Sequence, residues 1–414
     1  MNLHTLLTGL AVLVLATSCT AGTEGIFASI EKEQKIVTTG NLNTAATVTR
    51  MAELITDAST TPKTGILFVS GGQALFTKSN SMSVGTWGKS SVGQNVAAVG
   101  VAGSTVYAVA GGELWQSTDG SNWTATTGLA AGDIPYDLIP VREADGVTTN
   151  KLILVTMIAS TDPGNSSVTL YQYGRIYLLT GTGLSGPFTL MSPDYTSTGW
   201  PPSSVLGDPV ISAAFDGSNY YLASTSYVWY WHSGDSGSAT SAVALPSASL
   251  PASTCYTGLI YLGTVSGVTP ALYIGTGIKS GTTTGGSLFV GAAAPGSTPG
   301  SWTTIAPGVT YSTLPVAFGQ FLYNNVNNSL WIATGNTTGT SQQGTGYMEY
   351  SLASSSFSTT PITNSNNYSS SAIPTYAVGC LFYSQNGFYY LGTRAHGLWY
   401  WNESGSSTNP WTQD

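Results

Sequence analysis

The sequence predicts an all-β fold, a β-propeller of seven four-stranded blades. The stretch from Val99 to Gly128 contains four short apolar segments separated by Gly, Ser, Asp and Asn, which is the pattern of four consecutive strands. A similar pattern recurs along the chain, and helical periodicity is nearly absent after residue 50. One such sheet cannot bury both of its faces alone, so we expect copies of it to pack around a common axis.

The composition indicates a folded chain that does not bind nucleic acid. Of 414 residues, 42% are hydrophobic and only 7% are charged, which is the opposite of the composition of a disordered chain. The formal net charge is -8, and Lys and Arg together number 11. With so few cations the chain cannot form the basic stripe that a nucleic-acid partner requires.

The first 19 residues have the features of an export signal. The apolar run from residue 6 to residue 16 is shorter than the roughly 20 residues that span a bilayer, and it fits the core of a signal peptide. Three small residues precede Cys19, and this resembles the lipobox of bacterial lipoproteins, in which the cysteine is lipidated. The resemblance implies an exported protein, lipid-anchored to a bacterial membrane and facing the periplasm or the cell exterior. Ordinary secretion, with cleavage near residue 21, is the alternative.

The remaining chain divides into a tether and one large domain. Residues 20–47 hold a dense share of the charged residues and are expected to link the lipid anchor to the body. Residues 48–414 are expected to form the single propeller domain. Its ring closes in one of two ways: the last blade is complete by itself, or a segment near residues 36–39 adds a strand to it. Apolar-aromatic strands that recur once per blade begin at Ile66, Val106, Leu152, Tyr220, Leu272, Leu330 and Tyr389.

One turn carries a family resemblance. Ser117, Asp119, Gly120 and Trp123 resemble the Asp-box of the BNR and sialidase-like propellers, in which Ser-x-Asp is followed by Gly and then Trp. The aspartate is expected to accept hydrogen bonds from the backbone of its own turn, and the glycine to adopt a positive φ. In that family the box is structural, so the resemblance implies a folding element and not a catalytic one. It extends over residues 64–414.

The resemblance leaves three hypotheses for function. The first is a cell-envelope lipoprotein whose propeller is a non-catalytic binding or assembly scaffold for a protein or glycan partner. The alternative is a sialidase-like glycoside hydrolase, since sialidases bind a substrate carboxylate with three arginines; this chain has four, Arg50, Arg142, Arg175 and Arg394. Clustering of the last three at the channel mouth would favour the enzyme. The third hypothesis is a structural surface-coat protein. No catalytic residue is assigned.

Arg394 and His396 are the candidate ligand-binding residues, because they form a charged pair in a short turn of a chain with few charges. An exposed, solubilising turn is the alternative. The aromatic triplets at residues 229–231 and 399–401 could stack on sugars, but packing between blades is the favoured interpretation, since both faces of a blade are covered.

No cofactor or metal is predicted. Asp133, Asp137, Asp162 and Asp235 could bind calcium from loops, but they lack the regular acidic spacing of a dedicated site. Cys255 and Cys380 lie in apolar strands of blades that are not neighbours, so we expect two buried free thiols and no disulfide.

Overall fold

The computed structural model describes Leu42 and most of the chain from Thr47 to Asp414, and these residues contain strands but no helix. The predicted signal peptide, Cys19 and nearly all of the predicted tether lie outside the described residues. No helix within the described ranges is long and apolar enough to cross a membrane. Beyond residue 47 the structure does not describe residues 72–73, 81–85, 94, 163–164, 181–188, 191–208, 226, 233–240, 243–253, 266, 279–285, 306–316, 336–345, 358–377, 395 and 403–410.

The strands follow one another in antiparallel groups of four, which we call units. The first three units are β1 (Val48–Asp57), β2 (Thr64–Gly71), β3 (Ala74–Ser79) and β4 (Gly88–Lys89); β5 (Val96–Ala102), β6 (Thr105–Ala110), β7 (Glu113–Ser117) and β8 (Thr124–Ala125); and β9 (Asp133–Arg142), β10 (Thr149–Asp162), β11 (Asn165–Leu179) and β12 (Thr189–Leu190).

The fourth and fifth units are β13 (Ser212–Phe215), β14 (Asn219–Ala223), β15 (Val228–His232) and β16 (Ser241–Ala242); and β17 (Thr254–Leu262), β18 (Ala271–Ile278), β19 (Leu288–Ala292) and β20 (Thr303–Ile305). The last two are β21 (Ala317–Asn324), β22 (Ser329–Gly335), β23 (Tyr347–Ser351) and β24 (Ser356–Phe357); and β25 (Val378–Tyr383), β26 (Phe388–Thr393), β27 (Leu398–Asn402) and β28 (Thr412–Gln413).

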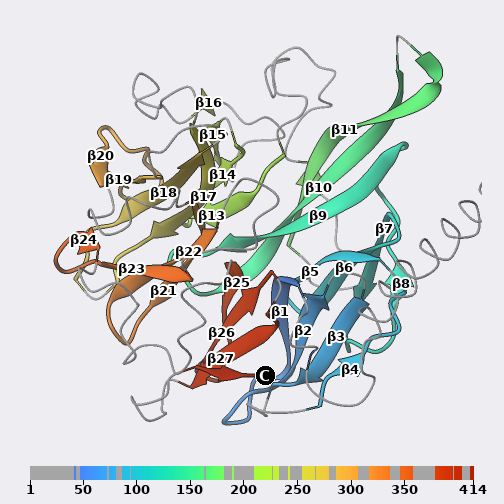
Figure 1. Cartoon of the computed structure of the whole chain (residues 1–414), viewed down its shortest axis with the longest axis horizontal. Coiled ribbons are helices and arrows are strands. Elements are labelled where there is room, and N and C mark those ends of the chain that lie inside the picture. Colours follow the sequence, from blue (N-terminus) through green and yellow to red (C-terminus); the bar gives the residue numbers. More distant parts are fainter. Residues whose placement is uncertain are drawn as a thin grey trace, which may run out of the picture.

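The units form a β-propeller (Figure 1). The innermost strands β1, β5, β9, β13, β17, β21 and β25 contact one another in this order, and β25 contacts β1, so the ring is closed. Apolar clusters fill the spaces between successive units and between the last unit and the first. Because both faces of a unit are covered, a middle strand such as β6 is buried at all six residues, and its sequence TVYAVA shows no alternation of apolar and polar side chains.

The expected count of seven separate four-stranded sheets is wrong. The strands of the described residues form six hydrogen-bonded sheets, of which five have four strands and one has eight. The eight-stranded sheet contains two successive units, because their innermost strands pair directly. β9 and β13 run parallel, with Val141 opposite Ala213 and Arg142 opposite Ala214. Elsewhere in the described ring, the innermost strands of neighbouring units do not pair, and the units meet through side chains and isolated backbone hydrogen bonds, such as that from the Tyr256 amide to the Thr225 carbonyl.

The β10–β11 hairpin is longer than the rest of its unit. β10 pairs with β9 only as far as Ile158, whereas β10 and β11 remain paired to their far end at Asp162 and Asn165. This end of the hairpin extends beyond the ring in Figure 1.

The last unit has four strands of its own, whereas residues 36–39, the other expected source of a closing strand, lie outside the described residues. β28 pairs with β27 inside the last sheet, so the closure seam, defined here as the contacts between the units β1–β4 and β25–β28, has no exchanged strand among the described residues. It is held instead by the apolar cluster that contains Val48, Cys380 and Tyr390, and by polar side chains.

Two polar groups cross the closure seam inside the protein. The Lys78 Nζ forms an ion pair with the Asp414 carboxylate, and the two side chains are only 2% and 0% exposed. Burial lowers the pKa of Lys78 and raises the pKa of Asp414, while the attraction between the two charges opposes both shifts. The buried Glu53 carboxylate accepts hydrogen bonds from Asn80 Nδ2 (2.8 Å), Ser384 Oγ (2.8 Å) and the Gln385 amide (2.7 Å).

We predict that Asp414→Ala lowers the free energy of unfolding by about 3 kcal/mol, because it leaves the Lys78 ammonium buried without its counter-charge. The double variant Lys78→Met/Asp414→Leu should recover most of this loss, since no charge then remains buried. Chemical denaturation measures both, with Lys89→Met, an exposed lysine of the same unit, as the control. A loss in the control as large as that of Asp414→Ala would refute the assignment.

Candidate functional site

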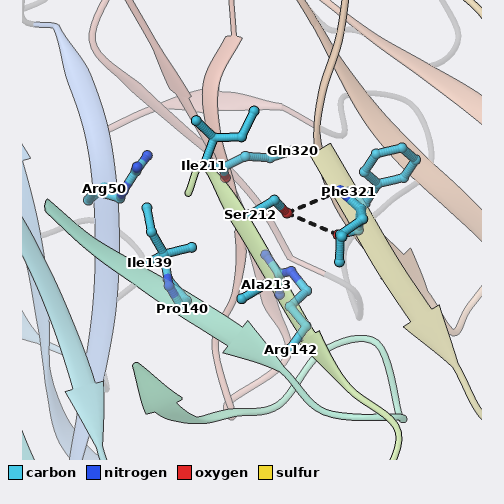
Figure 2. Close-up of a pocket in the computed structure, with 10 residues that line it drawn as sticks. Arg50, Ile139, Pro140, Arg142, Ile211, Ser212, Ala213, Gln320 and Phe321 are labelled. Carbon is cyan, nitrogen blue, oxygen red and sulfur yellow. Dashed lines mark hydrogen bonds between the residues drawn. The ribbon is translucent and has the colours of Figure 1, made fainter. Parts of the chain in front are cut away.

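A depression of about 380 Å³, counting the part open to solvent, lies at the centre of the ring (Figure 2). Its lining comes from the innermost strands and from Ile211, which directly precedes β13. The side chains that line it are Arg50, Ile139, Pro140, Arg142, Ile211, Ser212, Ala213, Leu259, Gln320 and Phe321. Two of the four arginines of the chain therefore meet in one depression whose walls are otherwise largely apolar.

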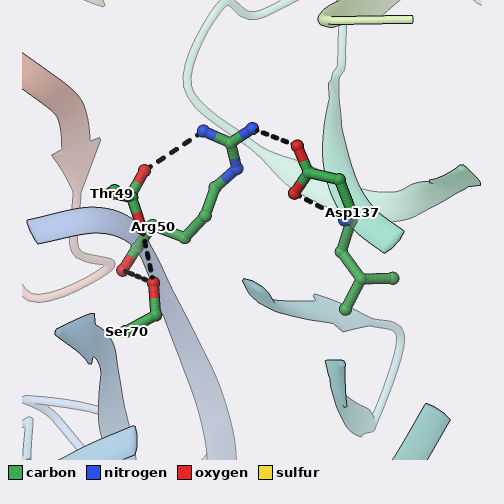
Figure 3. Close-up of polar contacts among 5 residues, drawn as sticks. Thr49, Arg50, Ser70 and Asp137 are labelled. Carbon is green, nitrogen blue, oxygen red and sulfur yellow. Dashed lines mark hydrogen bonds and ion pairs between the residues drawn. The ribbon is translucent and has the colours of Figure 1, made fainter. Parts of the chain in front are cut away.

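Arg50, near the start of β1, is joined to the third unit by an ion pair (Figure 3). Its Nη2 lies 2.7 Å from Asp137 Oδ2, and its Nη1 donates to the carbonyl of Thr49 at 3.1 Å. Asp137 Oδ1 accepts a further hydrogen bond from the Leu138 amide at 2.8 Å. The Nε of Arg50 is buried and has no hydrogen-bond acceptor, so this guanidinium retains one unused donor.

Arg142, the last residue of β9, reaches across the ring. Its Nη2 donates to the carbonyl of Leu381 in β25 at 3.0 Å, and its Nη1 lies 3.4 Å from the carbonyl of Val147. Within the described chain it has no carboxylate within 4.0 Å, and the four ion pairs are made by other cations. Burial lowers the pKa of Arg142 to about 10, so the group stays protonated at neutral pH.

Two polar side chains of the depression satisfy the backbone of the innermost strands. An innermost strand is the edge of its sheet, and its channel-facing N–H and C=O groups need partners when they are buried. Ser212 Oγ accepts from the Leu259 amide and donates to the Leu259 carbonyl, both at 3.1 Å. Gln320 Oε1 accepts from the Leu381 amide at 3.2 Å. Each of these two oxygens therefore already accepts a hydrogen bond from a backbone amide.

The turn that follows β9, residues 143–148, crosses the ring directly after Arg142, and we call it the floor turn. The Gly263 amide donates to the Ala144 carbonyl at 2.7 Å, and the Tyr323 amide to the Gly146 carbonyl at 3.3 Å. Because Gly263 follows β17 and Tyr323 lies in β21, a turn of the third unit crosses to the fifth and sixth units. Asp145 Oδ1 holds the turn by accepting from the amides of Val147 (3.0 Å) and Thr148 (2.8 Å). The floor turn therefore spans the ring.

From the sequence we did not expect Arg50 and Arg142 to lie together. The candidate ligand-binding residues, Arg394 and His396, do not line the depression. Arg394 is exposed in the turn between β26 and β27, and its carbonyl accepts from Thr47 Oγ1. The backbone carbonyl of the half-buried His396 accepts from Trp399 Nε1 at 3.1 Å. Arg175, on β11, pairs with Asp133 at 2.7 Å. Thus Arg142, Arg175 and Arg394 do not gather at the channel.

The turn between β7 and β8 has the hydrogen bonding that was expected of it. Asp119 Oδ1 accepts from the amides of Ser121 and Asn122, each at 2.8 Å, and from Ser117 Oγ at 2.9 Å. These bonds favour the ionised carboxylate and hold the pKa of Asp119 well below its usual value. Gly120 has a φ of +71°, and a Cβ there would lie 2.7 Å from the Phe68 ring of the first unit.

Trp123 packs against the same Phe68 ring, edge to face, with the ring centroids 6.2 Å apart. The turn therefore fixes the contact between the first two units. Asp216 makes the same kind of turn between β13 and β14, accepting from the amides of Ser218 (2.7 Å) and Asn219 (2.6 Å). The sequence signal for it was present but not used, since Asp-Gly-Ser-Asn occurs at residues 119–122 and again at 216–219.

The cysteines, the aromatic triplets and the loop aspartates that the sequence also suggested are buried or paired in the fold, or lie outside the described residues. Cys255 and Cys380 are free, buried thiols, as expected. Of the aromatic triplets, Trp229, Trp231 and Trp399 are buried in the clusters between units. Asp133 and Asp137 are paired with arginines, the Asp162 side chain and Asp235 lie outside the described residues, and no group of three metal-ligating side chains occurs among the residues described.

Comparisons with known proteins agree with the fold. No family model matches the chain, and no curated protein matches it in sequence. An ancestral GH74 enzyme is similar in structure, with a TM-score of 0.54 and 14% identity; the match covers 91% of this chain and 48% of that one. The chain thus spans about half the length of that enzyme. At this identity the likeness shows the fold, and the class of protein it defines is the β-propeller.

Two lyases are also similar in structure, with lower TM-scores. They are virginiamycin B lyase from Staphylococcus aureus, with a TM-score of 0.47, 10% identity and coverage of 87% of this chain and 96% of that one, and oligogalacturonate lyase from Vibrio parahaemolyticus, with a TM-score of 0.45, 8% identity and coverage of 84% and 88%.

We predict that Gly146→Ala lowers the free energy of unfolding by about 3 kcal/mol, because the floor turn has no room for a side chain. A Cβ at this position would overlap with Leu262 Cδ2 and lie 2.7 Å from Tyr323 Cβ. Gly111→Ala is the matched control, since its φ of +62° is close to the +73° of Gly146 and no atom lies within 4 Å of its Cβ position. Denaturation midpoints that shift equally in both variants would contradict the tight contact.

Proposed function

We propose that this protein is an exported, lipid-anchored binding scaffold of the bacterial cell envelope, whose propeller receives part of a protein or glycan partner in its central depression. The observation that carries the proposal is the lining of the depression, which offers cationic donors and apolar surface to a ligand. Loops on a rigid ring are suited to partner recognition, and the ring itself needs no chemistry for this role.

The lining argues for binding rather than hydrolysis. A glycoside hydrolase of the usual kind places two carboxyl groups about 5 to 10 Å apart around the scissile bond. The lining residues include no carboxylate, and the neighbouring Asp137 is neutralised by Arg50. Arg142, Arg175 and Arg394 also lie apart, so they do not form the cluster of three arginines that the sialidase-like alternative requires. The likeness to a GH74 enzyme keeps a glycan-directed enzyme as the second candidate.

The binding role is tested with the full chain, purified in detergent, on a glycan array and by crosslinking in native envelopes. We expect saturable binding of a defined partner and no released sugar in a parallel turnover assay. Release of a sugar would instead show that the protein is a glycan-directed enzyme. If neither a glycan nor a crosslinked envelope protein is bound, the binding proposal fails.

Lipid anchoring is tested at Cys19, which lies outside the described residues. Cys19→Ala should move the protein from the membrane fraction to the soluble fraction, because the proposed anchor is attached to this thiol. Cell fractionation followed by immunoblotting measures the change, and Cys255→Ala, a buried thiol in β17, is the control that should stay with the membrane. A Cys19→Ala protein that remains membrane-bound would exclude the lipid anchor.

A further inference from the structure

The depression holds one arginine that forms no ion pair among the described residues. Arg50 is paired with Asp137, whereas Arg142 donates only to backbone carbonyls. Asp145, which follows in the floor turn, is exposed and accepts hydrogen bonds from Val147 and Thr148, and its charge favours that of Arg142 without direct contact. A buried cation with no direct counter-ion is costly, so a bound anion in contact with Arg142 would be favoured here. A single guanidinium matches a carboxylate better than a doubly charged phosphate.

The rest of the lining indicates what the carboxylate is attached to. The oxygens of Ser212 and Gln320 are already bonded to the backbone of the innermost strands. Pro140 and Ile211 are half-buried and present apolar surface to the depression. A sugar placed here would meet the Gln320 amide nitrogen but no side-chain carboxylate of the lining, and each buried hydroxyl left without a partner costs about 1–3 kcal/mol. An apolar substituent beside the carboxylate has no such penalty.

The floor turn indicates which part of a polymer enters. Because residues 143–148 cross the ring and bond to Gly263 and Tyr323, a polymer cannot pass through the centre. A chain end does not have to pass through the ring, and it therefore fits a depression next to this turn. A peptide has such an end with both required features, since its last residue combines a carboxylate with a side chain.

We propose that the central depression binds the C-terminal residue of a partner protein, with the terminal carboxylate at Arg142 and a small apolar side chain against Pro140 and Ile211. This proposal rests on the binding function above and selects a protein partner over a glycan. Capture of a C-terminal carboxylate is a known mode of peptide recognition, and here the guanidinium can hold it by charge-assisted hydrogen bonds.

The experiment uses the full chain in detergent and four probes: acetyl-Ala-Val as the free acid, the same peptide as its C-terminal amide, isovalerate and glucuronic acid. Isothermal titration calorimetry should show that the peptide acid binds at least tenfold more tightly than the peptide amide, a comparison that needs no variant. Arg142→Met should remove this preference, and Arg394→Met, which changes an exposed arginine outside the depression, should preserve it. Thermal melting checks that both variants are folded.

Several results would overturn the assignment. Equal affinity for the acid and the amide, or no binding of either, refutes recognition of the carboxylate. Isovalerate that binds as tightly as the peptide acid identifies a small carboxylic acid as the ligand, and tighter binding of glucuronic acid identifies an acidic glycan. A partner captured from the envelope that binds independently of Arg142 refutes this inference and leaves the scaffold function standing, whereas the absence of any partner removes the scaffold function itself.

Discussion

Closure of the ring by side chains, with no exchanged strand in the part of the chain that the structure describes, is the constraint on which the central depression depends. Arg50 enters from the first unit, and Arg142 takes its acceptor from Leu381 in the last unit. Both arginines therefore depend on the contact between β1–β4 and β25–β28. The Lys78–Asp414 pair and the Glu53 carboxylate hold this contact with buried charges, which require a defined geometry because an unpaired buried charge is costly. Apolar packing alone tolerates small displacements more readily.

Sequence reasoning reached the architecture because the repeat is local. Each unit buries both faces, so its middle strands are short apolar runs bounded by glycine and polar turn residues, and these can be recognised one at a time. The Asp119 turn was accessible for the same reason, since its hydrogen bonds join residues no more than three positions apart. The fusion of two units into one sheet was not, because the β9–β13 pairing leaves no distinct mark in either strand.

The candidate site was beyond the reach of the sequence because it is assembled from distant residues. Arg50 and Asp137 are 87 positions apart, and Arg142 and Leu381 are 239 apart. Arg394 attracted attention as a charge in a turn, yet exposure and a short loop do not create a site. What distinguishes Arg142 is its tertiary environment, namely two carbonyl acceptors and no ion pair among the described residues.

The direct pairing of β9 with β13 has a mechanical consequence. Backbone hydrogen bonds are short and directional, whereas apolar side chains can slide against one another, so the third and fourth units move as one stiff body. Any widening of the ring must then be taken up among the other units, whose innermost strands do not pair with one another in the described part of the chain. Gln320 and Leu381 lie in that compliant part, opposite the stiff joint, and the Arg142 side chain spans the two. A ligand that draws Arg142 away from Leu381 would therefore loosen the part of the ring that contains Leu381, while the third and fourth units keep their positions relative to each other.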